Sequence, residues 1–335
     1  MKKGILLINL GTPDSPSVSD VRKYLREFLM DARVIDMPYI PRWFLVNVII
    51  ATFRAPKSAH AYQSIWDNEK GSPLMYYSKK IAENWQKEMG DEVIVELAMR
   101  YQSPSIKSAL ERLKQQNITE LEIIPLFPQY ASSTSGSAIE KAMEIINTWE
   151  TIPSINIVSS FFHRPKLIEG FTKVLAENAK KLLDKDTYDY ILFSYHGVPE
   201  RHIHKSCDNG HCQLGDCCQQ LSEKNQLCYR AQCFETTKLI AGKLGLDKNQ
   251  YQTVFQSRLT TRAREPWLQP YADEVITALG KGGKKKLLVF SPAFVADCLE
   301  TIEEIGEEYK ELFQENGGEH LQLVESLNDT SIFTA

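Results

Sequence analysis

The sequence lacks an apolar run long enough to cross a bilayer, an excess of basic charge and a glycine-rich phosphate loop. Spanning a bilayer takes about 20 apolar residues, and no stretch approaches that length. The formal net charge is −4, so nucleic acid is not an expected partner. Neither Gly-x-Gly-x-x-Gly nor a Walker A sequence follows the first apolar segment, which argues against a nucleotide cofactor. The composition, 43% apolar and 24% charged, is otherwise that of an ordinary globular protein.

Length and periodicity predict an α/β protein of two domains. The 335 residues are too many for one compact core, and apolar strand-like runs alternate with amphipathic helical patterns. Short apolar runs of this kind are typical of parallel strands buried on both faces. We place the domain boundary after Phe162, which gives domains 1–162 and 163–335. The predicted strands are 5–10, 92–99, 120–125, 155–160, 190–195, 252–256 and 286–291. The first predicted helix is capped by Ser19-Asp20. The other predicted helices are 78–88, 105–115, 137–149, 167–183, 235–244 and 271–279.

One apolar segment has two interpretations. Residues 43–53 (Trp-Phe-Leu-Val-Asn-Val-Ile-Ile-Ala-Thr-Phe) are almost wholly apolar and lie between Pro41 and Pro56. A helix buried in the core would have this composition. An exposed apolar lip that meets an apolar ligand or a membrane surface would have it too.

Cysteine is sparse except in one segment. Six of the seven cysteines lie between residues 207 and 233, in a segment rich in Gly, Asp, Asn and Gln. The N-terminal run is short, lacks a small-residue cleavage site and is better interpreted as a strand than as a secretory signal. Without such a signal, clustered thiols favour metal binding over disulfides. Four thiolates could hold a two-iron two-sulfur cluster or a structural zinc ion.

His196 follows a predicted strand directly. The run Phe-Ser-Tyr-His-Gly-Val-Pro (193–199) ends a strand, and Gly197 and Pro199 break it. Loops at the carboxyl ends of parallel strands collect ligands. Imidazole there could move protons near neutral pH or bind a metal. A histidine hydrogen-bonded into a turn is the other interpretation.

Three glutamates recur at helical spacing near the C-terminus. Glu300, Glu304 and Glu308 lie at i, i+4 and i+8, so an α-helix would align them on one face. A solvated acidic face is one interpretation. The other is a ladder of carboxylates that conducts protons or divalent cations, because hard cations prefer oxygen ligands.

The chain resembles the ferrochelatase family through motifs that occur in order over nearly its whole length. These are Gly-Ile-Leu-Leu-Ile-Asn-Leu-Gly-Thr-Pro-Asp (4–14), Met-Arg-Tyr (99–101), Pro-Gln-Tyr through Thr-Ser-Gly-Ser (128–137), the His196 run, Phe-Gln-Ser-Arg (255–258), Pro-Trp (266–267), Phe-Val-Ala-Asp-Cys-Leu-Glu-Thr-Ile-Glu-Glu (294–304) and Glu-Ser-Leu-Asn (325–328). Cys298 stands where many members have a second histidine.

The resemblance implies a lyase that inserts ferrous iron into protoporphyrin IX, the last step of heme biosynthesis. It implies a chelatase-like fold: two similar domains, each a parallel four-stranded sheet flanked by helices, with the porphyrin in the cleft between them. His196 and Glu300 would be catalytic, face each other across the ring and meet the substrate iron. Arg100, Tyr130, Trp267 and Glu304 would contact the substrate, and residues 43–53 would form the lip. For Arg100, pairing with a propionate or a place near the metal path stands beside a structural ion pair at the strand end.

Some ferrochelatases carry a two-iron two-sulfur cluster on an internal cysteine insertion, here about residues 204–233. The resemblance therefore favours that cluster over zinc. We expect its ligands among Cys212, Cys217, Cys218, Cys228 and Cys233, with one of the adjacent pair used. The resemblance also implies a cytoplasmic enzyme that touches the inner face of the membrane through its lip. The apolar lip favours protoporphyrin over the more charged coproporphyrin. The oligomeric state is left open.

Overall fold

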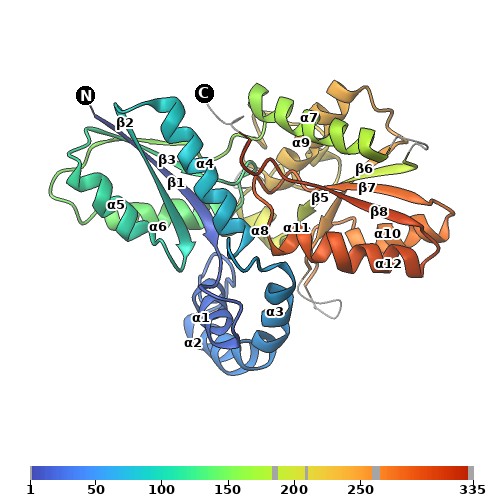
Figure 1. Ribbon diagram of the computed structural model, residues 1–335, viewed down its shortest axis with the longest axis horizontal. Helices are drawn as coiled ribbons and strands as arrows, with labels where there is room; N and C mark the ends of the chain where they lie inside the picture. Colours follow the sequence, from blue (N-terminus) through green and yellow to red (C-terminus); the bar gives the residue numbers. More distant parts are fainter. Residues whose placement is uncertain (1, 183–187, 208–209, 259–264, 331–335) are drawn as a thin grey trace. The chain divides into compact units, whose positions relative to one another are not determined.

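The computed structural model describes residues 2–182, 188–207, 210–258 and 265–330, and of residues 180–182 only the backbone (Figure 1). The chain forms two compact units. The described part of the first comprises residues 2–127, 131–160 and 328–330, and that of the second comprises residues 128–130 and the described residues from 161 to 327. The chain passes between units at Ser160–Phe161, close to the boundary expected after Phe162.

The first unit is built on a parallel sheet of four strands. Its order is β2-β1-β3-β4, formed by β1 (Lys3–Gly11), β2 (Val93–Tyr101), β3 (Glu120–Pro125) and β4 (Ser154–Ile157). Leu6 and Ile8 of β1 face α5 (Ile106–Gln115) and α6 (Ser137–Ile146) in one continuous core. On the other face lies α4 (Pro73–Met89), where Ser78 accepts a hydrogen bond from Asn9 at 2.9 Å (Figure 1).

A helical extension at the carboxyl end of this sheet contains the apolar segment. It consists of α1 (Val18–Leu29), α2 (Tyr39–Phe44), a π-helical turn η1 (Leu45–Ile50) and α3 (Ala51–Ile65) (Figure 1). Val46 and Ala51 are fully buried, whereas Phe53 is 77% exposed and Ile40 79% exposed. The segment is therefore helical with one buried face, and its other face presents apolar side chains to solvent.

The second unit repeats the same sheet topology. Its strands are β5 (Tyr190–His196), β6 (Tyr251–Gln256), β7 (Lys286–Phe290) and β8 (His320–Val324), in the parallel order β6-β5-β7-β8. Helices α7 (Pro165–Leu182) and α9 (Tyr229–Leu244) cover one face, and α10 (Ala272–Lys281) and α12 (Tyr309–Glu315) cover the other (Figure 1). The short elements are α8 (Glu200–Lys205), η3 (Asp216–Cys218), α11 (Leu299–Ile302) and the π-helical turn η4 (Glu304–Glu308).

These observations confirm the predicted α/β fold with two parallel four-stranded sheets flanked by helices, and they correct several details. Strand β8 was missed, because its sequence His-Leu-Gln-Leu-Val mixes polar with apolar residues. Helix α1 is capped by Ser17, whose Oγ accepts the Asp20 N–H at 3.2 Å, rather than by Ser19-Asp20. Helix α9 begins at Tyr229, six residues before the predicted start. The continuous α-helix expected through the three glutamates is wrong, because η4 interrupts it.

The ranges that the structure describes contain no helix that is both long and apolar enough to span a membrane.

Candidate functional site

His196 is the last residue of β5, opposite Gln256 of β6. Its Nδ1 lies 2.7 Å from the carbonyl oxygen of Gly197. A carbonyl oxygen can only accept, so Nδ1 must carry the proton and neutral imidazole keeps its lone pair on Nε2. The side chain is therefore prepared to accept a proton or bind a metal through Nε2.

Gly197 is required by the close approach of neighbouring backbone. Its N–H donates to the Gln256 carbonyl at 2.7 Å, and a β-carbon at this position would lie 2.9 Å from that same oxygen. The Trp267 ring also lies close, 3.5 Å from the place of that β-carbon. Any larger residue would push β5 away from β6 or from Trp267, and either shift would displace His196.

Trp267 is held against the histidine motif by backbone pairing. Pro199 and Trp267 form an antiparallel bridge, and the flanking N–H groups of Glu200 and Leu268 donate to the carbonyls of Pro266 and Val198 at 3.0 Å each. The side chain is 8% exposed. Trp267 thus supports the loop after His196.

Glu304 is surrounded by hydrogen-bond donors. It accepts from the Ser257 N–H at 2.8 Å, the Ser257 hydroxyl, the Tyr309 hydroxyl at 2.9 Å and Gln256 Nε2 at 3.2 Å. Burial raises the pKa of Glu304, while these donors and the nearby His196 oppose the rise; the net pKa is raised. A carboxyl with a raised pKa is better suited to exchange protons near neutral pH than an ordinary one.

Ser257 and Gln256, which the sequence analysis did not single out as site residues, organise this carboxylate. Ser257 has a left-handed backbone with φ of 64°, which costs about 1–3 kcal/mol in a residue other than glycine. That conformation turns both its N–H and its hydroxyl toward Glu304. Gln256 is 1% exposed; its Oε1 accepts from Ser194 at 2.6 Å, and its Nε2 also donates to the Glu300 carbonyl at 2.8 Å. The sequence signal that could have identified them is the pair of polar residues, Gln256 and Ser257, directly after the apolar Val254 and Phe255 of β6.

The three glutamates have different environments. Glu300 lies in α11 and is partly buried, Glu304 opens η4, and Glu308 ends η4 and is exposed. Within η4 the Glu308 N–H donates to the Glu303 carbonyl, the i→i+5 bond of a π-turn. π-Turns within α-helices are frequent at functional sites. The Glu304 carboxylate interacts electrostatically with His196.

Tyr130 belongs to a short segment anchored in the second unit. Its N–H donates to Gln232 Oε1 of α9 at 2.6 Å, and the preceding Gln129 donates through Nε2 to Thr236 at 3.0 Å and to the Pro292 carbonyl at 3.3 Å. The Tyr130 side chain is partly exposed.

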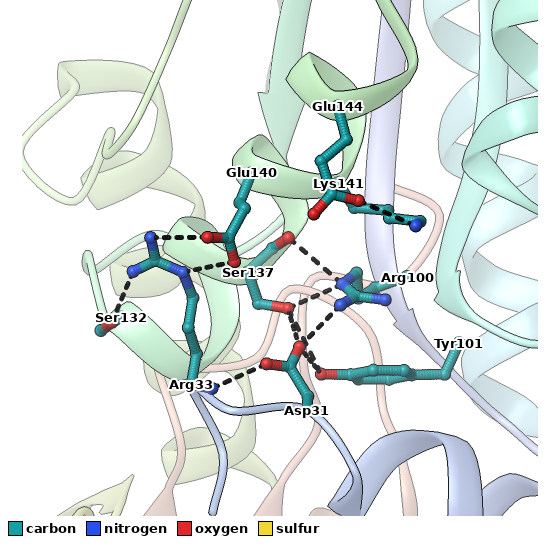
Figure 2. A network of polar contacts seen from close by, with 9 residues as sticks. All are labelled: Asp31, Arg33, Arg100, Tyr101, Ser132, Ser137, Glu140, Lys141 and Glu144. Carbon is teal, nitrogen blue, oxygen red and sulfur yellow. Dashed lines mark hydrogen bonds and ion pairs between the residues drawn. The ribbon is translucent and has the colours of Figure 1, made fainter. Parts of the chain in front are cut away.

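Arg100, in the first unit, belongs to a buried polar network (Figure 2). Its Nη2 pairs with Asp31 Oδ2 at 2.7 Å, and its Nε donates to the Ser137 hydroxyl at 2.7 Å. The Tyr101 and Ser137 hydroxyls also donate to Asp31. Burial alone would raise the pKa of Asp31, but these donors and Arg100 lower it. Arg100 therefore does form an ion pair at its strand end.

The cysteines of residues 207–233 surround the start of α9. Cys217 Sγ and Cys218 Sγ lie 3.6 Å apart, the Cys212 N–H donates to Cys207 Sγ at 3.1 Å, and the Gln213 N–H donates to Cys217 Sγ at 3.3 Å. A hydrogen bond from Cys218 lowers the pKa of Cys228, the N-cap residue of α9, and backbone N–H groups of that helix lower it further.

Cys233 is fully buried inside α9, and burial raises its pKa well above the ordinary thiol value. Cys218 is buried too, and its hydrogen bond with Cys228 together with its burial raises its pKa. Among the described residues, no three His, Cys, Asp or Glu side chains are arranged to hold a metal ion. The other five cysteines of the segment contact one another or nearby backbone N–H groups, without a closed metal site among the described residues. They are Cys207, Cys212, Cys217, Cys218 and Cys228.

Comparisons with known proteins agree with the motifs. The sequence model of the ferrochelatase family matches residues 2–335. The chain is 49% identical over 330 residues to a ferrochelatase of Legionella pneumophila (strain Paris), covering 98% of this chain and 95% of the relative. It is 46% identical over 328 residues to a ferrochelatase of Coxiella burnetii (strain Dugway 5J108-111), covering 98% of this chain and 89% of the relative.

A solved structure, SirB from Bacillus subtilis with Fe3+, shares the fold with a TM-score of 0.51 and 12% identity, covering 99% of this chain and 91% of that one. That likeness concerns the fold alone. Family match and identity extend over almost the whole length, and they show that the chain belongs to the ferrochelatase family.

Proposed function

We propose that this protein inserts ferrous iron into protoporphyrin IX to give protoheme, with release of the two pyrrole protons. The observation that carries the proposal is the His196 imidazole, whose Nδ1–H is engaged by Gly197 so that Nε2 is the basic atom. Family membership supplies the reaction class, and this geometry supplies the base that the reaction needs.

The chemistry requires a base, a proton path and a bent ring. Nε2 of His196 would take protons from pyrrole nitrogens as iron enters. Glu300 would strip water from the iron, since ferrous iron accepts carboxylate and imidazole ligands. Glu304, whose pKa burial raises, would pass protons onward. Exposed Glu308 would receive them near solvent.

We propose that Tyr130, Trp267 and the lip hold the porphyrin in its bent form, using binding energy from the rest of the ring. For Arg100, we propose that Nη1 binds a propionate. Within the described residues, neither a hydrogen bond nor an ion pair uses this atom, whereas Nε and Nη2 are engaged by Ser137 and Asp31.

The donor chemistry of the cysteine segment fits a two-iron two-sulfur cluster. We propose Cys212, Cys228 and one or both of Cys217 and Cys218 as ligands, with structural zinc as the alternative. Backbone N–H groups are directed at the sulfurs of Cys207 and Cys217, and contacts of this kind tune such clusters. We favour Cys207 over the buried Cys233 as a further ligand. When bound, the cluster would stabilise the segment or regulate it, because iron insertion itself needs no redox step.

The cluster assignment has its own test. Protein purified without oxygen should contain iron and sulfide in equal amounts and absorb in the visible range, and Cys228→Ser should lose both. If the protein is colourless and contains stoichiometric zinc, the segment binds structural zinc and the cluster assignment is wrong. Cys233→Ser serves as the matched control and should keep its iron.

The function is tested by anaerobic incubation with ferrous iron and protoporphyrin IX, followed by visible spectroscopy. We expect protoheme to form, and His196→Ala and Glu300→Ala to reduce the rate by at least a hundredfold, the usual scale of general acid–base catalysis. His163→Ala, a change at an exposed histidine, should be neutral. Insertion into sirohydrochlorin or coproporphyrin but not protoporphyrin would reject the assigned substrate.

We also propose a cytoplasmic enzyme that contacts the membrane through its lip. In the structure α2 extends the lip of residues 43–53 back to Tyr39, and we use the name for residues 39–53 from here on. Its exposed apolar side chains support this proposal, and they are Tyr39, Ile40, Trp43, Phe44, Val48, Ile49 and Phe53.

A further inference from the structure

Tyr229 joins the cysteine segment to the candidate catalytic histidine. It is the first residue of α9 and directly follows Cys228, the N-cap residue. Its ring is 7% exposed, and its hydroxyl donates to the backbone carbonyl of His196 at 2.8 Å. The residue next to the candidate metal ligand Cys228 therefore makes a direct hydrogen bond to the last residue of β5.

The bonded carbonyl belongs to the peptide group that joins His196 to Gly197. The N–H of the same peptide group donates to the Gln256 carbonyl at 2.7 Å. A peptide group is planar, so holding its oxygen through Tyr229 and its N–H through Gln256 fixes the orientation of the whole plane.

That plane determines where the next carbonyl lies. The Gly197 carbonyl accepts the proton of His196 Nδ1 at 2.7 Å, and this bond selects the tautomer with its lone pair on Nε2. If the 196–197 peptide rotated, the Gly197 oxygen would move from Nδ1 and the tautomer would no longer be fixed. The Tyr229 hydroxyl thus acts on the imidazole through one peptide group.

A buried phenol needs a hydrogen-bond partner in any case, so a purely structural role must be distinguished. The chain offers a matched comparison in Tyr190, the first residue of β5. Its hydroxyl also donates to a backbone carbonyl, that of Tyr251, at 3.1 Å. Tyr190 makes the same type of bond at the opposite end of the same strand from His196.

We propose that Tyr229 is a positioning residue that couples the occupancy of the cysteine segment to the tautomer of His196. The inference rests on the proposed roles of His196 and of the cysteines. A ligand bound at Cys228 holds the first turn of α9, and Tyr229 then holds the 196–197 peptide. Without that ligand the first turn of α9 is held less firmly, and so is the carbonyl of His196.

The first test uses protein with ¹⁵N-labelled histidine, in which the His196 signals are identified by their loss in His196→Ala. In Tyr229→Phe, both ring nitrogens of His196 should shift toward the average of the two tautomers. The kcat/KM for iron insertion should fall about tenfold, the effect of one hydrogen bond, and its pH profile should change while the iron content does not. Tyr190→Phe should alter none of these. Equal His196 spectra in the two variants would overturn the proposal.

The second test removes the ligand and the phenol together. Cys228→Ser should shift the His196 signals when Tyr229 is present and add nothing in the Tyr229→Phe background. Equal shifts in both backgrounds would reject the coupling. If Cys228→Ser does not fold, Cys212→Ser, whose cysteine is not adjacent to Tyr229, provides the same comparison. The imidazole signals are read without porphyrin, so a negative iron-insertion assay would reject the proposed function and leave this test intact.

Discussion

Glu304 shows how a single residue is tuned at the expense of stability. Burial opposes its charge, and Ser257, Tyr309, Gln256 and His196 recover only part of the loss, so its pKa stays above the ordinary value. A carboxyl with a raised pKa binds protons more tightly in the folded than in the unfolded chain. Between the two pKa values the native state holds more protons, and stability must fall as pH rises through that window.

Glu304→Gln should therefore stabilise the protein above the ordinary glutamate pKa. The gain should be absent near pH 4, increase as pH rises through the folded pKa and then stay constant. We expect the melting temperature of the variant to exceed that of the unchanged protein by a margin that grows with pH, because burial disfavours only the ionised glutamate. Melting curves between pH 5 and 8 would show it, and iron insertion should be largely lost.

Glu311→Gln is the control for this prediction, because Glu311 is exposed on α12 one turn beyond the site. Its melting temperature should follow that of the unchanged protein at every pH. A gain for Glu304→Gln that does not vary with pH would contradict the explanation by burial.

Asp31 connects three secondary-structure elements of the first unit, α1, β2 and α6. The carboxylate follows α1 and receives donors from the end of β2 and the start of α6 (Figure 2). Its lowered pKa has the opposite consequence to that of Glu304: it stabilises the fold above the ordinary aspartate pKa, and this stability is lost as pH falls through the folded value.

Asp31→Asn should cost about 3–5 kcal/mol at neutral pH, because it leaves the Arg100 guanidinium largely buried without its counter-charge. Chemical denaturation at pH 7 would measure this. The matched control is Arg33→Ala, which breaks the neighbouring, more exposed pair with Glu140 (Figure 2) and should cost less than about 1 kcal/mol. Similar losses for the two variants would show that the Asp31 network is no stronger than a surface pair.

Two glycines near α12 allow its packing to be tested. A β-carbon at Gly318 would lie 2.3 Å from the buried Phe313 ring, whereas one at Gly306 would meet its nearest atom, in Leu323, at an ordinary 3.5 Å. Gly318→Ala should therefore destabilise by about 1–3 kcal/mol through overpacking. Gly306→Ala should be neutral or stabilising by up to about 1 kcal/mol. Thermal melts would measure the stability of both variants. A Gly306→Ala protein less stable than the Gly318→Ala protein would be inconsistent with this packing.

The strands could be predicted because a strand buried on both faces leaves a plain signal in the sequence. Leu6, Leu7 and Ile8 are all fully buried, as a continuous apolar run implies, and so β1 was recognisable. The turn η4 was not, because a single i→i+5 bond leaves the apolar periodicity of its helix almost unchanged. The donors around Glu304 come from two separate parts of the chain, the end of β6 and the start of α12, and spacing within one segment cannot reveal them. The position of His196 at the end of a strand could be predicted because a strand end is a local signal.

Over the whole chain, the two units use one topology for different purposes. Each sheet places its first strand second in the order and its second strand at an edge. In the second unit the first strand ends at His196. In the first unit it leads into the helical extension that carries the apolar lip. The shared frame is therefore specialised by the segment that comes directly after each first strand.

The lip gives a prediction for the whole molecule. Ile40 and Phe53 are so exposed that changing them to serine should leave the fold intact, while Arg54 and Lys57 beside them are exposed and cationic. Apolar side chains next to cations favour anionic membranes. The double change Ile40→Ser with Phe53→Ser should weaken binding to phosphatidylglycerol-containing vesicles by at least tenfold in co-sedimentation, given about 1.5–3 kcal/mol for each large apolar side chain withdrawn from water. Ile152→Ser, at a half-exposed apolar residue of the same unit outside the lip, should bind as before. Equal binding of all three proteins would assign the lip to the porphyrin alone, since its apolar face would then have no measurable affinity for lipid.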